Sequence, residues 1–266
     1  MTDEISPKRT FDPDFARRLH RALTAGGDEL HGVLQDPSPE VLRGALKNRN
    51  LGEEHLLGLL KRRDLNEDLL KAIWQLTIST DSHRLQMALV HNPGTPGAVV
   101  LALLPRLHLF ELVDLCYLPG VTPDQKFAAE RAILQRLPTT ELGNKMTVAR
   151  RATAAVVGEI LKEGDPPLVE ICLASPHLRE VAILQFLNGP AVTAETISMV
   201  ARHPRWQMRP NLRLAILRNH RTPGIWFTQF LPGMRSPDVR NLLASKRLNP
   251  NQKKLVEEEL KRRGGR

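Results

Sequence analysis

Apolar residues recur along most of the chain at the spacing of an amphipathic α-helix. Leucines follow this spacing between Leu56 and Leu70, and a second clear run extends from Ile183 to Val200. No stretch alternates apolar and polar residues around a hairpin turn such as Asn-Gly, so the pattern does not favour a sheet. Aromatic residues, which strands prefer, make up only 4% of the chain. The sequence therefore predicts an all-α protein.

The expected helices begin at small polar residues that are followed by proline. The side-chain oxygen of such a residue can accept a hydrogen bond from an unpaired N–H of the first turn, and proline at the first helical position lacks only an N–H that would have no partner. Equivalent starts lie roughly 25 to 45 residues apart, the spacing of helical-hairpin repeats. The seven pairs are Asp12-Pro13, Ser38-Pro39, Thr95-Pro96, Thr122-Pro123, Thr222-Pro223, Ser236-Pro237 and Asn249-Pro250.

The sequence also indicates an internal duplication. With an offset of 127 residues, positions 41–137 align with positions 168–264 without a gap, and about 19 of about 97 positions are identical. The segment ALVHNPGTPG at 88–97 falls on AILRNHRTPG at 215–224. Most of the other substitutions keep an apolar residue apolar. We therefore expect the second half of the fold to repeat the first.

Together these patterns predict a right-handed α-solenoid of stacked helical hairpins that forms one continuous domain. The segment TVARRATAAVVGEILK is interpreted as one longer helix, over about 145–162, that connects the two halves. The expected parts are N-terminal capping helices over 1–35, a first repeat half over 36–137, the connecting helix within 138–167, and a second repeat half with the C-terminal cap over 168–266.

The segment HRLQMALVHNPGTPGAVVLALL at 83–104, together with 211–231 and 237–250, resembles the repeats of leucine-rich-repeat-variant and HEAT-like α-solenoids. The resemblance implies a binding surface more often than an enzyme. Some leucine-rich-repeat-variant proteins carry an iron–sulfur cluster on an N-terminal cysteine-rich segment, but this chain has no cysteine before Cys116. HEAT-like DNA glycosylases use an aspartate with tryptophans on such a scaffold, so a glycosylase is one alternative function.

The sequence contains no catalytic motif that we would assign. Neither a phosphate-binding glycine-rich loop nor a G-x-S-x-G elbow occurs. The nine histidines nowhere form HExxH or another metal-ligand spacing, so we expect no metal and no cofactor. Cys116 and Cys172 lie in apolar helices, which predicts buried thiols. Glu111 and Asp114 could face a groove, but they lack a partner motif. We therefore predict a protein that is not an enzyme.

Positive charge is the strongest local signal. The net charge is +9 and the pI is near 10.0, which favours an acidic partner. The stretch 196–237 contains seven arginines and no Asp or Glu, whereas the corresponding stretch of the first half, 69–110, has a net charge of only +2. Arg213, Arg218 and Arg221 replace Gln86, His91 and Gly94 of the first half, so the shared repeat does not require these arginines.

We expect the residues of this basic stretch to form one exposed patch. Trp206 has arginine neighbours and could offer a stacking face, although buried packing is the simpler interpretation. A solvated basic ridge, or one neutralised by acids elsewhere in the fold, would have the same sequence. The candidate residues for binding an anion or a partner are Arg202, Arg205, Trp206, Arg209, Arg213, Arg218 and Arg221.

The sequence thus predicts a non-catalytic binding or scaffold protein whose solenoid surface contacts a protein or another macromolecule. The main alternative is a sequence-tolerant nucleic-acid-binding protein. The polar N-terminus, and the absence of any run near the roughly 18 apolar residues of a membrane span, predict a cytoplasmic protein.

Overall fold

The structure is a computed structural model that describes residues 12–245 and 247–264. Over these residues it contains nineteen α-helices, three single-turn 3₁₀ helices and no strand, so the prediction of an all-α protein is confirmed. The chain forms two compact units that divide after Ala132. Residues 1–11 of the expected N-terminal cap lie outside the described residues, and the expectation of one continuous domain stays a prediction.

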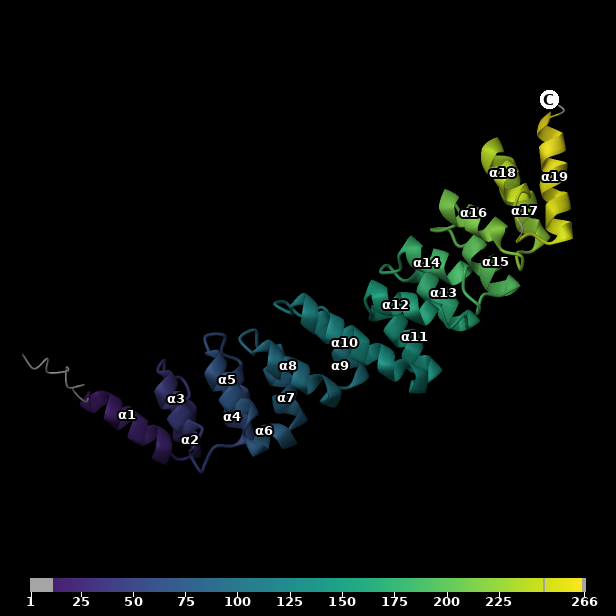
Figure 1. Ribbon diagram of the computed structural model, residues 1–266. Coiled ribbons are helices and arrows are strands. Elements are labelled where there is room, and N and C mark those ends of the chain that lie inside the picture. Colours follow the sequence, from purple (N-terminus) through teal and green to yellow (C-terminus); the bar gives the residue numbers. More distant parts are fainter. Residues whose placement is uncertain (1–11, 246, 265–266) are drawn as a thin grey trace, which may run out of the picture. The chain divides into compact units, whose positions relative to one another are not determined.

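The first unit contains short helices joined by tight turns (Figure 1). In chain order they are α1 (Pro13–Thr24), α2 (Gly27–Val33), α3 (Pro39–Ala45), α4 (Glu53–Leu60), α5 (Glu67–Trp74), α6 (Thr77–Asp81), α7 (His83–His91), α8 (Gly97–Leu103), η1 (Leu104–Arg106), α9 (Leu109–Leu115) and the beginning of α10 (Pro123–Arg136).

The second unit continues from the end of α10 with helices of similar length. In chain order they are η2 (Leu137–Thr139), α11 (Leu142–Arg151), α12 (Ala154–Leu161), α13 (Pro166–Ala174), α14 (Glu180–Leu187), α15 (Ala194–Arg202), α16 (Pro210–Arg218), α17 (Gly224–Phe230), η3 (Leu231–Gly233), α18 (Ser236–Leu243) and α19 (Pro250–Gly264).

Within each unit, helices pack mainly against the next helix but one. In the first unit α1 packs on α3, α3 on α5 and α5 on α7, while α2 packs on α4 and α4 on α7. In the second unit α11, α13 and α15 form one such series, and α12, α14, α16 and α18 form another. Figure 1 shows the successive hairpins of each unit side by side. Helices inside these series, such as α3, α5, α13 and α14, therefore have neighbours on two sides, which their apolar residues require.

Leucines from both series fill the core of the first unit, and aromatic residues join them in the second. Leu56, Leu59 and Leu85 have no exposed surface, and Phe186 and Phe227 are at most 1% exposed. Burial of one such side chain contributes about 1.5 to 3 kcal/mol relative to exposure. The helices are also short, from five residues in α6 to fifteen in α19. In the described ranges, none has both the length and the apolar character needed to cross a bilayer.

Four of the seven polar–proline pairs begin helices as predicted. Asp12 and Ser38 accept hydrogen bonds from N–H groups of the first turn, and proline occupies the first position of α1, α3, α10 and α19. In the two Thr-Pro pairs before α8 and α17 the threonine has another partner. Thr95 Oγ1 donates to Leu89 O at 2.6 Å and Thr222 Oγ1 donates to Ile216 O at 2.5 Å, and the proline itself is the N-cap residue. In the seventh pair, Ser236 is already helical.

The C-terminal carbonyls of many helices accept hydrogen bonds from side chains that lie 23 to 33 residues later in the chain. Asn92 is typical: its amide donates to Leu60 O at 2.9 Å and to Arg62 O at 2.7 Å. Asn48 donates to Ala22 O in the last turn of α1 and to Ala25 O after it, and Asn219 donates to Leu187 O at the end of α14. The asparagine oxygen closes its own turn by accepting the N–H two residues later. Each hairpin thereby satisfies the free carbonyls of the one before it.

The predicted connecting helix over 145–162 is wrong. The structure has two helices there, α11 and α12, because Ala152 and Thr153 adopt extended backbone conformations with ψ near 168° and 162°. A single helix of this length would present apolar residues all around its circumference and could bury only one side. The break lets α11 pack on α13 while α12 packs on α14. The short helix α6 was also not predicted.

Helix bounds agree closely between the two halves. The ranges of α4, α7, α8 and η1 recur unchanged 127 residues later as α14, α16, α17 and η3. A helix follows both Thr-Pro pairs, as expected. The exception is α6, whose counterpart at 204–208 is a turn that contains Pro204. The duplication inferred from the sequence is compatible with these bounds.

Both cysteines are free and buried. Burial raises the pKa of the Cys116 thiol to about 11 and that of Cys172 to about 12. Since the thiolate is the reactive form, we expect neither thiol to react with a disulfide reagent at about pH 8 in the native protein. Both should react at once in guanidinium chloride. Native labelling at the rate of a free cysteine would contradict this burial.

Substitution of Asn92 should weaken the stacking of hairpins. Asn92→Ala removes the donors for Leu60 O and Arg62 O, so the free energy of unfolding should fall by about 1 to 3 kcal/mol. The exposed Asn211, whose side chain has no hydrogen bond to a described residue, is the matched control. Urea unfolding measures both variants. Equal effects of Asn92→Ala and Asn211→Ala would show that the amide is not a stabilising cap.

Candidate anion-binding site

The seven residues predicted to bind a partner lie on α15, on α16 and in the turns that follow these helices. All of them belong to the second unit. In chain order they are Arg202 at the end of α15; Arg205 and Trp206 in the next turn; Arg209, the N-cap residue of α16; Arg213 and Arg218 on α16; and Arg221 in the turn before α17.

Trp206 is part of the core. Only 3% of its surface is exposed, and its indole N–H donates to Leu173 O at 2.9 Å. The guanidinium of Arg205 covers the ring at 4.4 Å from its centroid. Pro204 and Pro210 bound a turn outside regular helix. The structure therefore shows the simpler interpretation, buried packing, and a nucleobase could stack on Trp206 only if the ring left the core.

Two of the arginines stabilise the stack, which corrects part of our expectation. Arg205 donates to Ser175 O at 2.8 Å and to Leu178 O at 3.2 Å. Arg221 donates to Pro190 O at 2.9 Å and also to Val192 O. Both guanidinium groups thus satisfy carbonyls of the preceding turn. Folding therefore accounts for Arg221, although the equivalent position in the first half is glycine.

Arg213 and Arg202 are held by their own neighbourhood. Arg213 Nε donates to Gln207 O at 2.6 Å, and its guanidinium lies 5.0 Å from the centroid of the Phe230 ring. Arg202 Nε donates to Ser198 O, one turn earlier on α15, at 3.2 Å. The positive charges of Arg202 and Arg213 are not neutralised, because no carboxylate among the described residues forms an ion pair with either side chain.

Arg209 and Arg218 are exposed, and no described residue forms a side-chain hydrogen bond or ion pair with them. They lie at opposite ends of α16, about 13 Å apart along the helix axis. Arg213 lies beside a cavity that also contains Arg235 and Asp238, whereas Arg218 and Arg221 line a different cavity. The structure thus distributes the predicted patch over two places.

The cavity at the C-terminal end of α16 has a volume of about 640 Å³ and an entirely basic or neutral lining. Arg218, Arg221 and Arg247 supply three guanidinium groups, and His220 and Asn219 lie beside them. Arg247, which sequence reasoning missed, is exposed and donates to Asn188 Oδ1 at 3.4 Å. Because Arg247 comes from the turn after α18, nothing in the local sequence connects it to α16.

The first unit has a related cavity of about 400 Å³ in the corresponding place, 127 residues earlier. Its lining includes Leu60, Ala88 and Asn92, which correspond to Leu187, Ala215 and Asn219 of the second cavity.

The first cavity differs from the second in charge. It contains Glu54, which binds the guanidinium of Arg84 at 2.9 Å, and its other lining residues include His91 in place of Arg218. Glu53 binds the same guanidinium at 3.2 Å. The same scaffold thus carries a partly neutralised cavity in one half and a cavity without carboxylates in the other.

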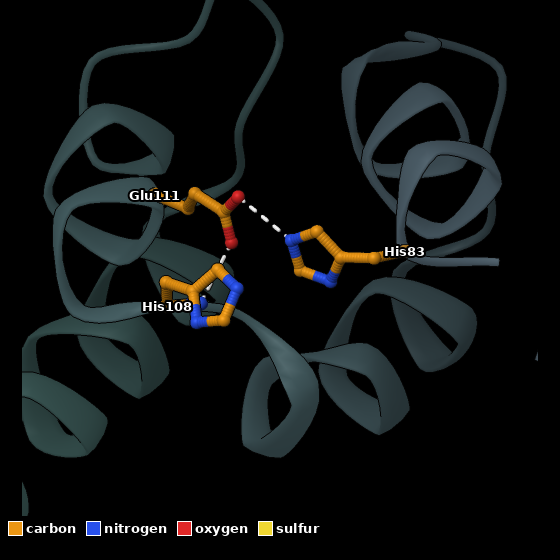
Figure 2. Close-up of side chains that lie close together, drawn as sticks. All are labelled: His83, His108 and Glu111. Carbon is orange, nitrogen blue, oxygen red and sulfur yellow. Dashed lines mark hydrogen bonds and ion pairs between the residues drawn. The ribbon is translucent and has the colours of Figure 1, made fainter. Parts of the chain in front are cut away.

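A second candidate site lies in the first unit, where three possible metal ligands approach one another. His83 is the first residue of α7, His108 is the N-cap residue of α9, and Glu111 lies in the first turn of α9. Figure 2 shows His83 directed toward the Glu111 carboxylate, with His108 on the same segment as Glu111. The nearest ligand atoms of all three residues lie within 4.8 Å of one another. They are the one such group found in the part of the chain that the structure describes.

Hydrogen bonds orient the carboxylate of this group. Glu111 Oε1 lies 2.7 Å from His83 Nε2, and Glu111 Oε2 accepts the backbone N–H of His108 at 2.6 Å. The two imidazole rings are 4.5 Å apart. Burial raises the pKa of Glu111, but the bonds from His83 and the His108 N–H and the charges of both imidazoles lower it overall. No linear motif reveals this group, because His108 and Glu111 follow His83 by 25 and 28 positions, which is the spacing of successive hairpins.

Comparisons of the chain with models of known protein families, with curated proteins and with solved structures found no match. The site therefore has to be interpreted from its own geometry.

The arginines should separate into structural and free groups by mutation. Arg221→Ala leaves Pro190 O and Val192 O without their donor, so it should lower the free energy of unfolding by about 1 kcal/mol or more. Arg218→Ala should change it by less than about 0.5 kcal/mol, because the side chain is exposed and unpaired. Chemical denaturation of the two variants measures the difference. Equal losses would contradict the distinction between the two residues.

Proposed function

We propose that the chain is a right-handed α-solenoid built from a duplicated set of helical hairpins. The packing of alternate helices and the shared helix bounds of the two halves support this proposal. So do the carbonyl-capping side chains, which repeat at hairpin spacing. The sequence resemblance to HEAT-like and leucine-rich-repeat-variant families agrees with it.

We propose further that the protein is a non-catalytic scaffold that binds an anionic macromolecular partner through the second half. The single observation that carries this proposal is the cavity of Arg218, Arg221 and Arg247, which lacks any carboxylate. Guanidinium groups bind phosphate and carboxylate with two parallel hydrogen bonds, and they lose less hydration than an ammonium group on doing so. No described residue forms a side-chain hydrogen bond or ion pair with Arg218, and the Arg247 guanidinium forms only the long bond to Asn188, so both can donate to a ligand.

The position of the cavity favours a macromolecule over a small substrate. It opens at the turns between hairpins, and its charged lining side chains, those of the three arginines, are exposed, whereas small-molecule sites enclose most of their ligand. Its lining also contains no Asp or Glu that could serve as a nucleophile or a general acid. A cytoplasmic location, with both thiols reduced, remains part of the proposal.

A sequence-tolerant nucleic-acid-binding protein is the second candidate. The row of guanidinium groups in the cavity suits a phosphate backbone, and Arg209 and Arg213 at the other end of α16 could contact further phosphates. The burial of Trp206 removes the stacking face that the sequence had suggested. Trp226 is buried as well, so neither tryptophan of the second unit offers the exposed face that a glycosylase would need beside its acid.

Charge reversal in the cavity should weaken binding to polyanions. The variant Arg218→Glu with Arg247→Glu should bind a labelled single-stranded oligonucleotide, or heparin, about tenfold or more weakly at low salt. Its salt slope should fall by about one for each phosphate that the protein no longer neutralises. Fluorescence anisotropy at several salt concentrations measures both quantities. An acidic protein partner, by comparison, would leave oligonucleotide binding weak in the parent, and its capture from a lysate would survive nuclease treatment.

The matched control reverses two exposed arginines outside the cavity, Arg49 and Arg131. It changes the net charge by the same amount, so it should reproduce only the small, nonspecific part of the effect. If the two double variants bind polyanions equally, the cavity is ordinary solvated surface and the proposed function is wrong.

A further inference from the structure

We propose that His83, His108 and Glu111 form a binding site for a divalent transition-metal ion, with Zn²⁺ as the best-matched species. This site is independent of the arginine cavity and lies in the other unit. The residues supply two imidazole nitrogens and one carboxylate oxygen, a donor set typical of zinc sites with an open position. Ca²⁺ and Mg²⁺ prefer sites made mainly of oxygen, so the two histidines select against them.

The geometry requires only side-chain rotation. At zinc–ligand distances of about 2.0 to 2.1 Å, tetrahedral ligand atoms lie about 3.4 Å apart. The Glu111 oxygen and the His83 nitrogen are already closer than this, at 2.7 Å, and the third ligand atom lies within 4.8 Å. His108 is exposed and His83 is partly exposed, so both rings have room to turn. An ion entering between them would separate the first pair and draw in the third.

Glu111 is held in a favourable orientation before any ion binds. Its Oε2 accepts the His108 N–H in a capping arrangement, which leaves Oε1 directed at His83. Metal ligands are usually held by a further hydrogen-bond partner outside the metal site. The backbone N–H of His108 is such a partner for Glu111. A carboxylate coordinates a metal in its ionised form.

The field of the helices opposes the ion but does not exclude it. Both α7 and α9 begin at this site, and their N-terminal amides carry partial positive charge. Glu111 supplies the compensating negative charge. On binding, His83 Nε2 must give up any proton it carries, either to Nδ1 or to solvent, so that both imidazoles coordinate as neutral ligands.

The position 127 residues later has a different residue set, which shows that the hairpins do not need these ligands. There Pro210, Arg235 and Asp238 replace the three residues, and Arg235 Nε binds Asp238 Oδ2 at 3.0 Å. In the second unit an ion pair thus joins the two positions that correspond to His108 and Glu111, and this place cannot bind a cation. In the first unit the metal joins the turn before α7 to the turn before α9, and so it ties two successive hairpins together.

Metal titration of the full chain without an affinity tag tests the proposal. After treatment with a chelator, the protein should bind one Zn²⁺ per chain in competition with a chromophoric chelator, and Co²⁺ should give the visible absorption of a nitrogen–oxygen site. His83→Ala, His108→Ala and Glu111→Gln should each weaken Zn²⁺ binding by at least about tenfold, because loss of even an outer-shell partner costs that much. Glu111→Gln keeps the acceptor for the His108 N–H, and His108→Ala keeps that N–H.

The matched control is His31→Ala. His31 belongs to the other close histidine pair of the first unit, with its ring centroid 4.4 Å from that of His55, but the pair does not belong to any such ligand group. This variant should bind Zn²⁺ like the parent, and Zn²⁺ should raise the melting temperature of both but not that of His83→Ala. The proposal is overturned if the parent binds no Zn²⁺ up to roughly 100 μM, or if the three ligand variants bind it as the parent does.

Discussion

The structure depends on finding donors for the carbonyl groups at the ends of short helices. An α-helix leaves its last four carbonyls without an internal partner, so a helix of eight residues such as α4 or α14 leaves half of its carbonyls free. In a stack of hairpins many of these ends face the next hairpin instead of water. Side chains of that hairpin supply the missing donors, and the apolar core can close only because they do. Asn92, Asn219 and Gln252 serve in this way through their amides, and Trp206 through its indole N–H.

The same requirement explains why a basic surface and a stable stack occur together. Arginine presents five donors on a planar group, and one side chain can therefore satisfy two carbonyls while remaining at the surface. Arg62, Arg205, Arg221 and Arg263 all do so, each for the turn about one hairpin earlier. Part of the net positive charge is thus a consequence of folding. A smaller group of arginines caps no carbonyl and requires another explanation. Arg218 is the main example, because it lines a cavity with Arg247 that contains no carboxylate.

Local signals in the sequence were sufficient for several helix starts and insufficient for the sites. Proline after a small polar residue marks helix starts through the chemistry of the first turn, so α1, α3, α10 and α19 begin at the predicted residue. The break between α11 and α12 follows from packing, because both faces of that segment are covered by different helices. Likewise, the burial of Trp206 depends on a carbonyl 33 residues away. The groups around Arg247 and His83 depend on which turns lie next to each other, information that a linear motif does not contain.

The two halves show where such a scaffold can change its chemistry. Some core and capping positions are alike: Leu60 and Leu187, Asn92 and Asn219 occupy corresponding places around the two cavities. Other positions differ: Arg218 replaces His91, and Arg221, which satisfies two carbonyls, replaces Gly94. These core leucines and asparagine caps are the same in both units, although the ion pair of Arg235 and Asp238 replaces His108 and Glu111. Such a scaffold can carry different charges at corresponding positions, because the shared leucines and the amide caps of Asn92 and Asn219 connect the hairpins in both units.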